Sequence, residues 1–366
     1  MAGHDLDPQP VATTDRRFPC RQCGAKLEFA PGTSSLVCPY CSCVNEIAPV
    51  GVAEEIDYEA ALAKLASDAP QEFSASVSCT GCAAIVSPPA NVTSFSCPFC
   101  GTNIVVQPGG ASRIRPNGVL PFKITKQQAT SAFRKWLSSL WFAPSKLKTQ
   151  GMLNSGISGL YMPAWTYDAH ANTRYTGQRG DAYYETEWVT VNGKRESRRV
   201  RKIRWTSVAG RVENDFDDVV VLAGGSLPTD KAHKLEPWDT KDVVPYAHDY
   251  LAGFTAECYR VDLAQGFVMA QRLMQPEIDS TIRSDIGGDE QRISGKDSAY
   301  SEITFKHLLL PVWIAAYRFQ GKVYHFLVNA RTGEVQGERP WSAIKIAGAV
   351  LLGLMVAGVI VWLANR

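Results

Sequence analysis

The sequence predicts an α+β protein with small cysteine-rich modules near one end and an apolar helix near the other. Three observations carry this prediction. Nine of the ten cysteines lie in the first 100 residues, helix-like and strand-like stretches alternate in the middle, and the last stretch is almost wholly apolar. The chain of 366 residues is long enough for two or three folding units. Its formal charge of +2 gives no global field that points to nucleic acid or to an acidic partner.

Two quartets of cysteines repeat with the same spacing. In the first, Cys20 and Cys23 are followed after fourteen residues by Cys38 and Cys41. The second repeats this spacing 59 residues later, and Tyr40 and Phe99 occupy equivalent positions; its members are Cys79, Cys82, Cys97 and Cys100. Two residues between paired cysteines let both sulfurs point at one ion, and two such pairs complete a tetrahedron around Zn²⁺. Because four thiolates fill every coordination position, we expect two structural zinc ions.

The redox compartment supports metal rather than disulfides. The start of the chain is polar and lacks the apolar core of a secretory signal. We therefore expect the soluble part to lie on the cytosolic side, where thiols stay reduced. An iron centre of the rubredoxin kind uses similar cysteine pairs and remains an alternative to zinc. Cys43 is interpreted as a bystander that could compete for metal, and Cys258 as a core thiol.

Three helices are predicted from apolar periodicity before the C-terminal stretch. Thr125 can cap a helix over Thr125–Leu140, and Val52–Ala66 predicts a short amphipathic helix between the quartets. A further helix is predicted over Leu263–Met274, ended by Pro276.

Strands are predicted where β-branched and aromatic residues gather. The expected segments are a strand at Met162–Tyr175, a hairpin from Tyr183 through an Asn192-Gly193 turn to Val208, paired strands at Ile303–Phe319 and Val323–Asn329 joined at Gln320-Gly321, and a turn over Arg331–Glu334. The predicted fold class is therefore α+β, with two small four-cysteine zinc ribbons, a mixed α+β middle domain and one C-terminal transmembrane helix. The predicted segments are a disordered tail (1–17), zinc ribbon 1 (18–48), a helical spacer (49–76), zinc ribbon 2 (77–106), a linker (107–118), the α+β domain (119–340) and the transmembrane helix (343–364).

The hairpin carries a dense run of basic residues. Seven of them lie within eleven positions, against one Glu196: Lys194, Arg195, Arg198, Arg199, Arg201, Lys202 and Arg204. Because side chains alternate along a strand, Arg199 and Arg201 should share a face with Ile203, with Lys202 and Arg204 on the other. Three interpretations stay open: a solvated hairpin balanced by the acids at 215, 217 and 218, contact with anionic lipid headgroups, and contact with a nucleic-acid backbone.

The sequence shows none of the common catalytic motifs. It has no GxxxxGK[ST] phosphate loop, no HExxH and no GxSxG. Asp168 and His170 share a predicted strand face, which falls far short of a catalytic site. The acid pairs Asp217-Asp218 and Asp289-Glu290 are interpreted as turn and loop residues. We therefore expect a protein that is not an enzyme, without catalytic or cofactor-binding residues and without a small-molecule substrate.

A membrane anchor is predicted at Ile346–Ala364, which is nineteen uncharged and almost wholly apolar residues. A helix of this length measures roughly 28 Å, close to the hydrocarbon thickness of a bilayer. Arg331, Arg339 and Lys345 precede the segment and Arg366 follows it. This distribution of positive charge predicts a single-pass protein of the bacterial inner (cell) membrane with the bulk of the chain in the cytoplasm.

The paired CxxC…CPxC modules, the stretches Leu310–Trp313 and Tyr324–Glu334 and the membrane helix together resemble a bacterial family of zinc-ribbon membrane proteins. Many of its members are labelled primosomal-helicase-like, because their ribbons resemble those of the replication-restart helicase; the motor motifs of that helicase are absent here. The resemblance implies association with phage-shock and flotillin-like (SPFH) envelope-stress proteins, beside which such proteins recruit soluble partners to the membrane. This sequence departs from some of these relatives in having one span rather than several.

The leading hypothesis is a tail-anchored zinc-ribbon adaptor that docks cytoplasmic or membrane protein partners, of the SPFH or phage-shock type, at the membrane. The alternative is a membrane-tethered nucleic-acid-binding module, since ribbon surfaces often bind nucleic acid and the hairpin is basic. The second quartet weighs against the alternative, because the stretch from Cys79 to Cys100 contains no Lys or Arg.

Overall fold

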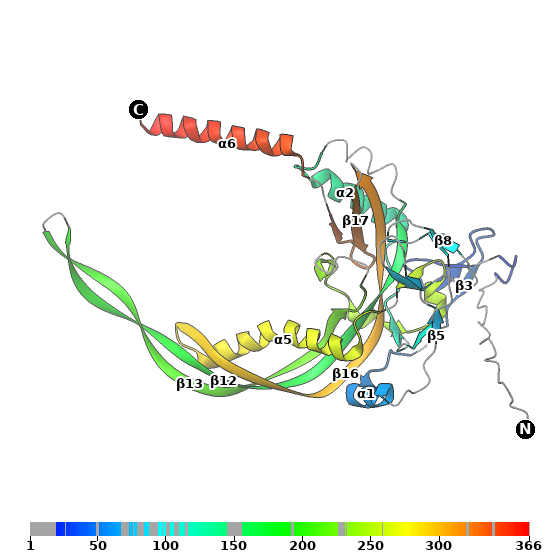
Figure 1. The fold of residues 1–366 in the computed structure, drawn as a ribbon, viewed down its shortest axis with the longest axis horizontal. Coiled ribbons are helices and arrows are strands. Elements are labelled where there is room, and N and C mark those ends of the chain that lie inside the picture. The colour runs from blue at the N-terminus through cyan, green and yellow to red at the C-terminus, as the bar shows by residue number, and fades with distance from the viewer. Residues whose placement is uncertain are drawn as a thin grey trace, which may run out of the picture.

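In the computed structural model the chain forms a mixed α+β body from which a long hairpin and the last helix project (Figure 1). This confirms the predicted α+β class. The residues that the structure describes are 20–25, 27–48, 51–66, 73–75, 77–78, 84–87, 94–96, 98–99, 103–105, 110–112, 114, 116–144, 156–191, 194–225, 231, 233–257, 259–319, 322–338 and 341–365. The predicted tail 1–17 and Cys258 lie outside them.

Helices are few and strands many among these residues. The α-helices are α1 (Tyr58–Ala66), α2 (Lys126–Ser139), α5 (Leu263–Ile286) and α6 (Ala343–Ala364), and the 3-10 helices are η1 (His233–Leu235), η2 (Thr240–Asp242) and η3 (His248–Leu251). The strands are β1 (Glu28–Phe29), β2 (Ser35–Val37), β3 (Val44–Glu46), β4 (Ile56–Asp57), β5 (Phe73–Ala75), β6 (Val77–Ser78), β7 (Ile85–Ser87), β8 (Ser94–Ser96), β9 (Asn103–Val105), β10 (Gly110–Ser112), β11 (Gly118–Val119), β12 (Ser158–Val191), β13 (Lys194–Leu222), β14 (Val244–Pro245), β15 (Thr255–Glu257), β16 (Glu290–Phe319), β17 (Lys322–Asn329) and β18 (Val335–Gly337).

One large sheet of eleven strands organises the described part of the chain. Its centre is the antiparallel pairing of β12 with β16, and β13 continues the sheet beyond β12. Along its other edge β16 pairs in turn with β4, with β11 in parallel, and with β17. The predicted strands at Ile303–Phe319 and Val323–Asn329 are paired as expected, with Phe319 opposite Lys322; the turn residues 320 and 321 lie outside the described residues.

The predicted strand at Met162–Tyr175 and the predicted hairpin are one continuous ribbon. β12 and β13 stay paired from Ala164 with Leu222 to Val191 with Lys194. β16 accompanies β12 only as far as Gly180, which lies opposite Glu290. Beyond that point, in the described residues, β12 and β13 pair only with each other. We call this two-stranded part, residues 181–191 and 194–204, the arm; Figure 1 shows it reaching far from the body.

Helix α5 lies in the concave side of the long ribbon (Figure 1). The prediction that Pro276 ends it near Met274 is wrong, because α5 continues to Ile286. A proline inside a helix costs about 3 kcal/mol. The turns after it bury Ile278, Ile282 and Ile286 against the sheet, and full burial of each such side chain stabilises by about 1.5–3 kcal/mol. Burial at four-residue spacing therefore outweighs the proline.

The other helix predictions differ mainly at their ends. α2 has the predicted cap, since the Thr125 hydroxyl accepts from the N–H of Gln128 and the Gln128 side chain accepts from the N–H of Thr125. The predicted helix over Val52–Ala66 is shorter, because Ile56–Asp57 pair with Thr304–Phe305 as β4 before α1 begins. Within the predicted linker 107–118, β10 pairs with β5 and β11 joins the large sheet.

The chain has one helix long and apolar enough to cross a membrane in its described part. Residues Ile344–Ala364 of α6 meet this criterion of length and composition, and none of them is buried against the body. The helix begins at the Ser342 cap, whose hydroxyl accepts from the N–H of Lys345. Lys345 Nζ donates to the carbonyl oxygens of Trp141 at 3.3 Å and Ala143 at 2.7 Å, so its charge sits against the body at the start of the helix.

Candidate metal centre

The first cysteine quartet is assembled as the spacing predicts. Cys20 and Cys23 precede β1, and Cys38 and Cys41 lie on the turn between β2 and β3. Sγ of Cys20 lies 3.5 Å from Sγ of Cys41, Sγ of Cys23 lies 3.5 Å from Sγ of Cys38, and all four sulfurs lie within 4.8 Å of one another. Tetrahedral zinc with bonds of ~2.3 Å places its sulfurs about 3.8 Å apart. The quartet therefore fits one zinc ion, and these separations are far too long for disulfides.

Both cysteine pairs use the same backbone knuckle. The N–H of Cys20 donates to Ala25 O and the N–H of Gly24 donates to Cys20 O. Eighteen residues later, the N–H of Cys38 donates to Cys43 O and the N–H of Ser42 donates to Cys38 O. Gly24 and Ser42 both have positive φ, 74° and 59°, which turns the chain back over the metal site.

Backbone amides of the knuckles lower the pKa of two of the four thiols, whereas for Cys23 and Cys41 a backbone amide is outweighed by burial and the neighbouring sulfurs, which raise the pKa. Backbone N–H groups of Cys23 and Gln22 point at the Cys20 sulfur and lower the pKa of that thiol to about 6. The N–H of Cys41 acts in the same way on Cys38 and lowers its pKa below the ordinary value. Since zinc binds the deprotonated thiol, these amides prepare the site for the metal.

Cys43 is part of the second knuckle and not a fifth ligand in this arrangement. Its carbonyl oxygen accepts the hydrogen bond from Cys38, as that of Ala25 does from Cys20. Its own sulfur lies 3.9 Å from the carbonyl oxygen of Val44. This geometry agrees with the bystander interpretation.

The first ribbon is packed onto the body. Cys20, Cys38 and Phe29 are buried in one cluster with residues of the large sheet and α2. The Phe29 ring meets Tyr250 edge-on with centroids 5.4 Å apart, and the Phe29 N–H donates to Ala252 O at 2.9 Å. Two ligands are therefore shielded from water, and with four thiolates around the ion no position is left open for a substrate.

One part of the first ribbon is displayed. Tyr40 lies between the ligands Cys38 and Cys41, and 82% of its surface is exposed. Val44, just past the same knuckle, is also exposed. An exposed aromatic side chain on a rigid metal-held turn is a feature that sequence spacing alone did not predict.

All four cysteines of the second quartet lie outside the described residues: Cys79, Cys82, Cys97 and Cys100. The neighbouring backbone nevertheless repeats the first ribbon. In the first module β2 pairs with β3, with Ser35 opposite Glu46. In the second module β8 pairs with β9, with Ser94 opposite Val105, and each of these two residues lies 59 positions after its counterpart in the first module. The duplication inferred from the sequence therefore extends to this β-hairpin.

The aromatic residue of the second module is buried. Phe99, which is equivalent to Tyr40, is 1% exposed and belongs to a core cluster with Leu235, Trp238 and Leu327. Nε2 of His325 donates to the Phe99 carbonyl oxygen at 2.8 Å. β7 of this module is also joined to the large sheet through β15.

A group of acids in the sheet does not form a second metal site. Oxygens of Asp168, Asp217 and Asp218 lie within 4.8 Å of one another, at a bulge of β13 rather than in the predicted turn. Lys306 already supplies the cation: its Nζ lies 3.0 Å from Asp218 Oδ1 and 2.9 Å from Glu55 Oε1. His170 is separately hydrogen-bonded to Asp215 at 2.7 Å, which raises the pKa of the imidazole.

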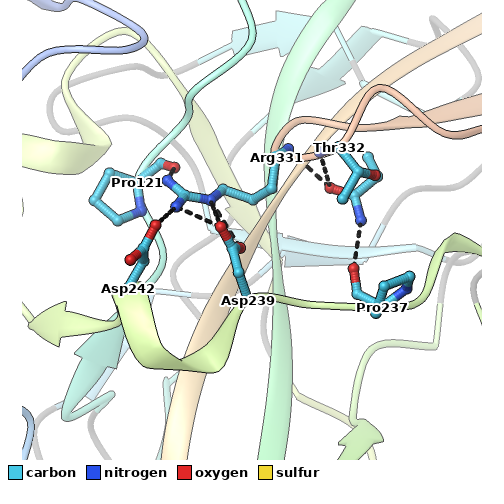
Figure 2. Close-up of polar contacts among 7 residues, drawn as sticks. Pro121, Pro237, Asp239, Asp242, Arg331 and Thr332 are labelled. Carbon is cyan, nitrogen blue, oxygen red and sulfur yellow. Dashed lines mark hydrogen bonds and ion pairs between the residues drawn. The ribbon is translucent and has the colours of Figure 1, made fainter.

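The Tyr324–Glu334 stretch builds a structural clamp, shown in Figure 2. The guanidinium of Arg331 donates to both oxygens of Asp239, to Asp242, and to the carbonyl oxygen of Pro121 at 2.9 Å. Burial raises the pKa of the Asp239 carboxyl, but Arg331 outweighs this and holds it below its ordinary value. Asn329 adds a bond to Leu235 O at 2.8 Å. The clamp ties the turn after β17 to the segment from η1 to η2.

Comparison with known proteins identifies one zinc ribbon domain. Residues 75–109, which include the second quartet, match the family described as the FORGETTER1 second zinc ribbon domain. A protein of Bacillus subtilis (strain 168) named "Uncharacterized protein YdjG" is 27% identical over 240 residues, which are 65% of this chain and 67% of that protein. No solved structure matches the chain. The primosomal-helicase-like label and the SPFH association remain predictions.

Proposed function

We propose that the chain is a membrane-anchored zinc-ribbon adaptor that uses the exposed knuckle of the first ribbon to dock a cytoplasmic or membrane protein partner. The observation that carries the proposal is the position of Tyr40, which stands in solvent on a turn fixed by two metal ligands. Aromatic side chains on rigid supports are frequent anchors of protein interfaces, because they bury a large area with little loss of conformational freedom.

The anchor fits the same function. α6 is apolar beyond Lys345, and Lys345 ties its first turn to the body. Placed in a membrane it would tether the body, and with it the first ribbon, which lies on the side of the body away from α6 (Figure 1). The proposed setting is the inner membrane of a bacterium, with one span and the bulk of the chain in the cytoplasm. Partners of the phage-shock or SPFH type follow from the family resemblance.

The role proposed for zinc is structural. The metal would hold two knuckles together in a module too small to fold on its own core. Cys20, Cys23, Cys38 and Cys41 would supply all four ligands. We propose no catalytic residue and no small-molecule substrate.

The test is affinity capture of the full chain from detergent-solubilised membranes, comparing the wild type with Tyr40→Ser and with Val52→Ser. Val52 is a matched control, because it is also 82% exposed but lies outside the metal-held turns. Loss of an aromatic anchor typically costs 2 kcal/mol or more, roughly a thirtyfold loss of affinity. We expect a partner that is retained by Val52→Ser and lost by Tyr40→Ser at unchanged zinc content. A partner held equally by both variants, or none above background, contradicts the proposal.

A further inference from the structure

The arm has two chemically different faces. Residues opposite each other in an antiparallel pair point to the same side, so the register assigns every position to a face. One face, which we call the arginine face, carries Tyr184, Thr186, Trp188, Arg195, Ser197, Arg199 and Arg201. The other carries Tyr183, Glu185, Glu187, Arg198, Val200, Lys202 and Arg204. The prediction that Arg199 and Arg201 share a face opposite Lys202 is confirmed.

Charge is balanced on one face and unbalanced on the other. Among the described side chains of residues 182–203, the arginine face has three arginines and no acid, whereas the opposite face has Glu185 and Glu187 against Arg198 and Lys202. Lys202 is bound there by Glu185 at 2.6 Å and Glu187 at 2.9 Å. On the arginine face, Arg201 is paired with Glu290 at the base of the arm. Arg195 and Arg199, further out, have no carboxylate partner among the described side chains.

Aromatic rings accompany these two arginines. The Arg195 guanidinium lies 5.5 Å from the centre of the Trp188 ring, and that of Arg199 lies 4.5 Å from the centre of the Tyr184 ring. Both rings are largely exposed, Trp188 by 62% and Tyr184 by 55%. Tryptophan and tyrosine are enriched at the level of lipid headgroups, where one part of the ring is wet and the other apolar. Arginine pairs well with phosphate.

The arm and α6 leave the body towards the same side (Figure 1). If α6 lies in a bilayer, the arm is on the side of the body that faces that bilayer. The arm reaches as far from the body as α6 does (Figure 1). A ribbon carrying arginines at this density cannot enter the hydrocarbon, so contact with headgroups requires α6 to cross the bilayer at another angle to the body, which brings the arm onto the membrane surface. We propose that the arginine face binds the anionic headgroups of the membrane that holds α6. The proposal needs α6 as an anchor but does not depend on the docking role of Tyr40.

The experiment uses the full chain in lipid nanodiscs, of phosphatidylcholine alone or of equal parts of phosphatidylcholine and phosphatidylglycerol. The photoreactive residue p-benzoylphenylalanine replaces Trp188 on the arginine face or Val189 on the opposite face. Lipid crosslinked to the arm is then measured by mass spectrometry. We expect adducts at position 188 on anionic discs, and few at position 189 or on neutral discs.

Two charge variants with the same net charge give the matched comparison. R195Q/R199Q removes two charges from the arginine face, and R198Q/R204Q removes two from the opposite face. Each basic residue near an anionic surface contributes about fivefold to binding. We therefore expect R195Q/R199Q to lower the adduct at position 188 roughly 25-fold, and R198Q/R204Q to leave it within about twofold.

Several results would overturn the proposal. They are equal adducts at 188 and 189, no dependence on phosphatidylglycerol, equal effects of the two charge variants, or transfer of the crosslink to an added single-stranded DNA oligonucleotide, which would indicate a nucleic-acid surface instead. Recovery of the chain in the discs is scored separately. Failure to enter them contradicts the anchor itself, whereas entry without arm adducts rejects only the arm contact and leaves the adaptor proposal standing.

Discussion

The two cysteine modules share their spacing and the register of one hairpin, yet they present equivalent aromatic residues in opposite ways. Tyr40 is 82% exposed beside the first metal site, whereas Phe99 is 1% exposed in a core of the large sheet. The second module also joins the sheet through β7, while β1 pairs with its own neighbour β2. The difference teaches that the spacing of the cysteines predicts the metal site but does not predict whether the aromatic residue between them is buried or exposed. Both modules pack against the body, but the knuckle aromatic is buried in the second and exposed in the first.

The largest difference in stability is expected between two single variants, in which Phe99 or Tyr40 is replaced by alanine. Phe99→Ala removes a buried ring and should destabilise the chain by about 3–5 kcal/mol. Tyr40→Ala removes an exposed ring and should change stability by no more than about 0.5 kcal/mol. Urea unfolding of the full chain in detergent micelles measures both. Equal destabilisation by the two variants would contradict the comparison.

Loosening the site that receives Phe99 should have the next largest effect. Arg331 fixes the segment that carries Leu235 and Trp238, which belong to the same buried cluster as Phe99. Arg331→Met should leave the carboxylates of Asp239 and Asp242 without their donor and cost about 2 kcal/mol, reduced from buried-pair values because both acids are partly exposed. The same urea experiment checks this, and an unchanged unfolding midpoint would show that the clamp does not support the Phe99 site.

The clamp also predicts a pH dependence. The folded-state pKa of Asp239 lies below its ordinary value, so its contribution is fully present above the unfolded value of about 3.9. That contribution is lost as pH falls through the lower folded value. The wild type should therefore lose stability over this acid range more steeply than Arg331→Met. Parallel stability–pH curves of the two proteins would exclude the ion pair as the cause.

Smaller effects should distinguish the two knuckles of the first ribbon. Gly24 has φ of 74° and open space around an added Cβ, so Gly24→Ala should cost about 1 kcal/mol through backbone strain alone. Ser42 holds the equivalent position with φ of 59°. Ser42→Gly should stabilise the folded ribbon by a few tenths of a kcal/mol, because the relief of backbone strain slightly exceeds the extra conformational freedom that glycine gives the unfolded chain. Competition with a zinc chelator reports both, because the metal is bound only by the folded knuckle. Tighter zinc binding by Gly24→Ala would contradict the equivalence of positions 24 and 42.

Sequence reasoning predicted the elements whose signals are local. The Thr125 cap, the cysteine knuckle at Cys20–Cys23, the pairing of β16 with β17 and the apolar α6 all follow from residues close together in the chain. It failed at Pro276, because the burial that keeps α5 going comes largely from β12 and β13, which are distant in the chain: Tyr175 meets Asp285 across 110 positions and Asn214 meets Thr281 across 67.

The candidate sites that sequence missed depend on contacts between distant segments. Lys306 meets Glu55 across 251 positions, and His325 meets Phe99 across 226. No periodicity or spacing marks these partners. The faces of the arm were predictable, since alternation along a strand needs only the strand itself; the arginine–aromatic pairs needed the cross-strand register that places Arg199 beside Tyr184.

The central prediction is that both modules bind structural zinc, although Tyr40 is exposed and its equivalent Phe99 is buried. Zinc content of the full chain, measured by native mass spectrometry from micelles, tests it most directly. We expect two zinc ions in the wild type and one in Cys38→Ser/Cys41→Ser, which should unfold the first ribbon and leave the second loaded. Cys97→Ser/Cys100→Ser should likewise retain one ion. A single ion in the wild type, or a count unchanged by either pair of substitutions, would contradict the account.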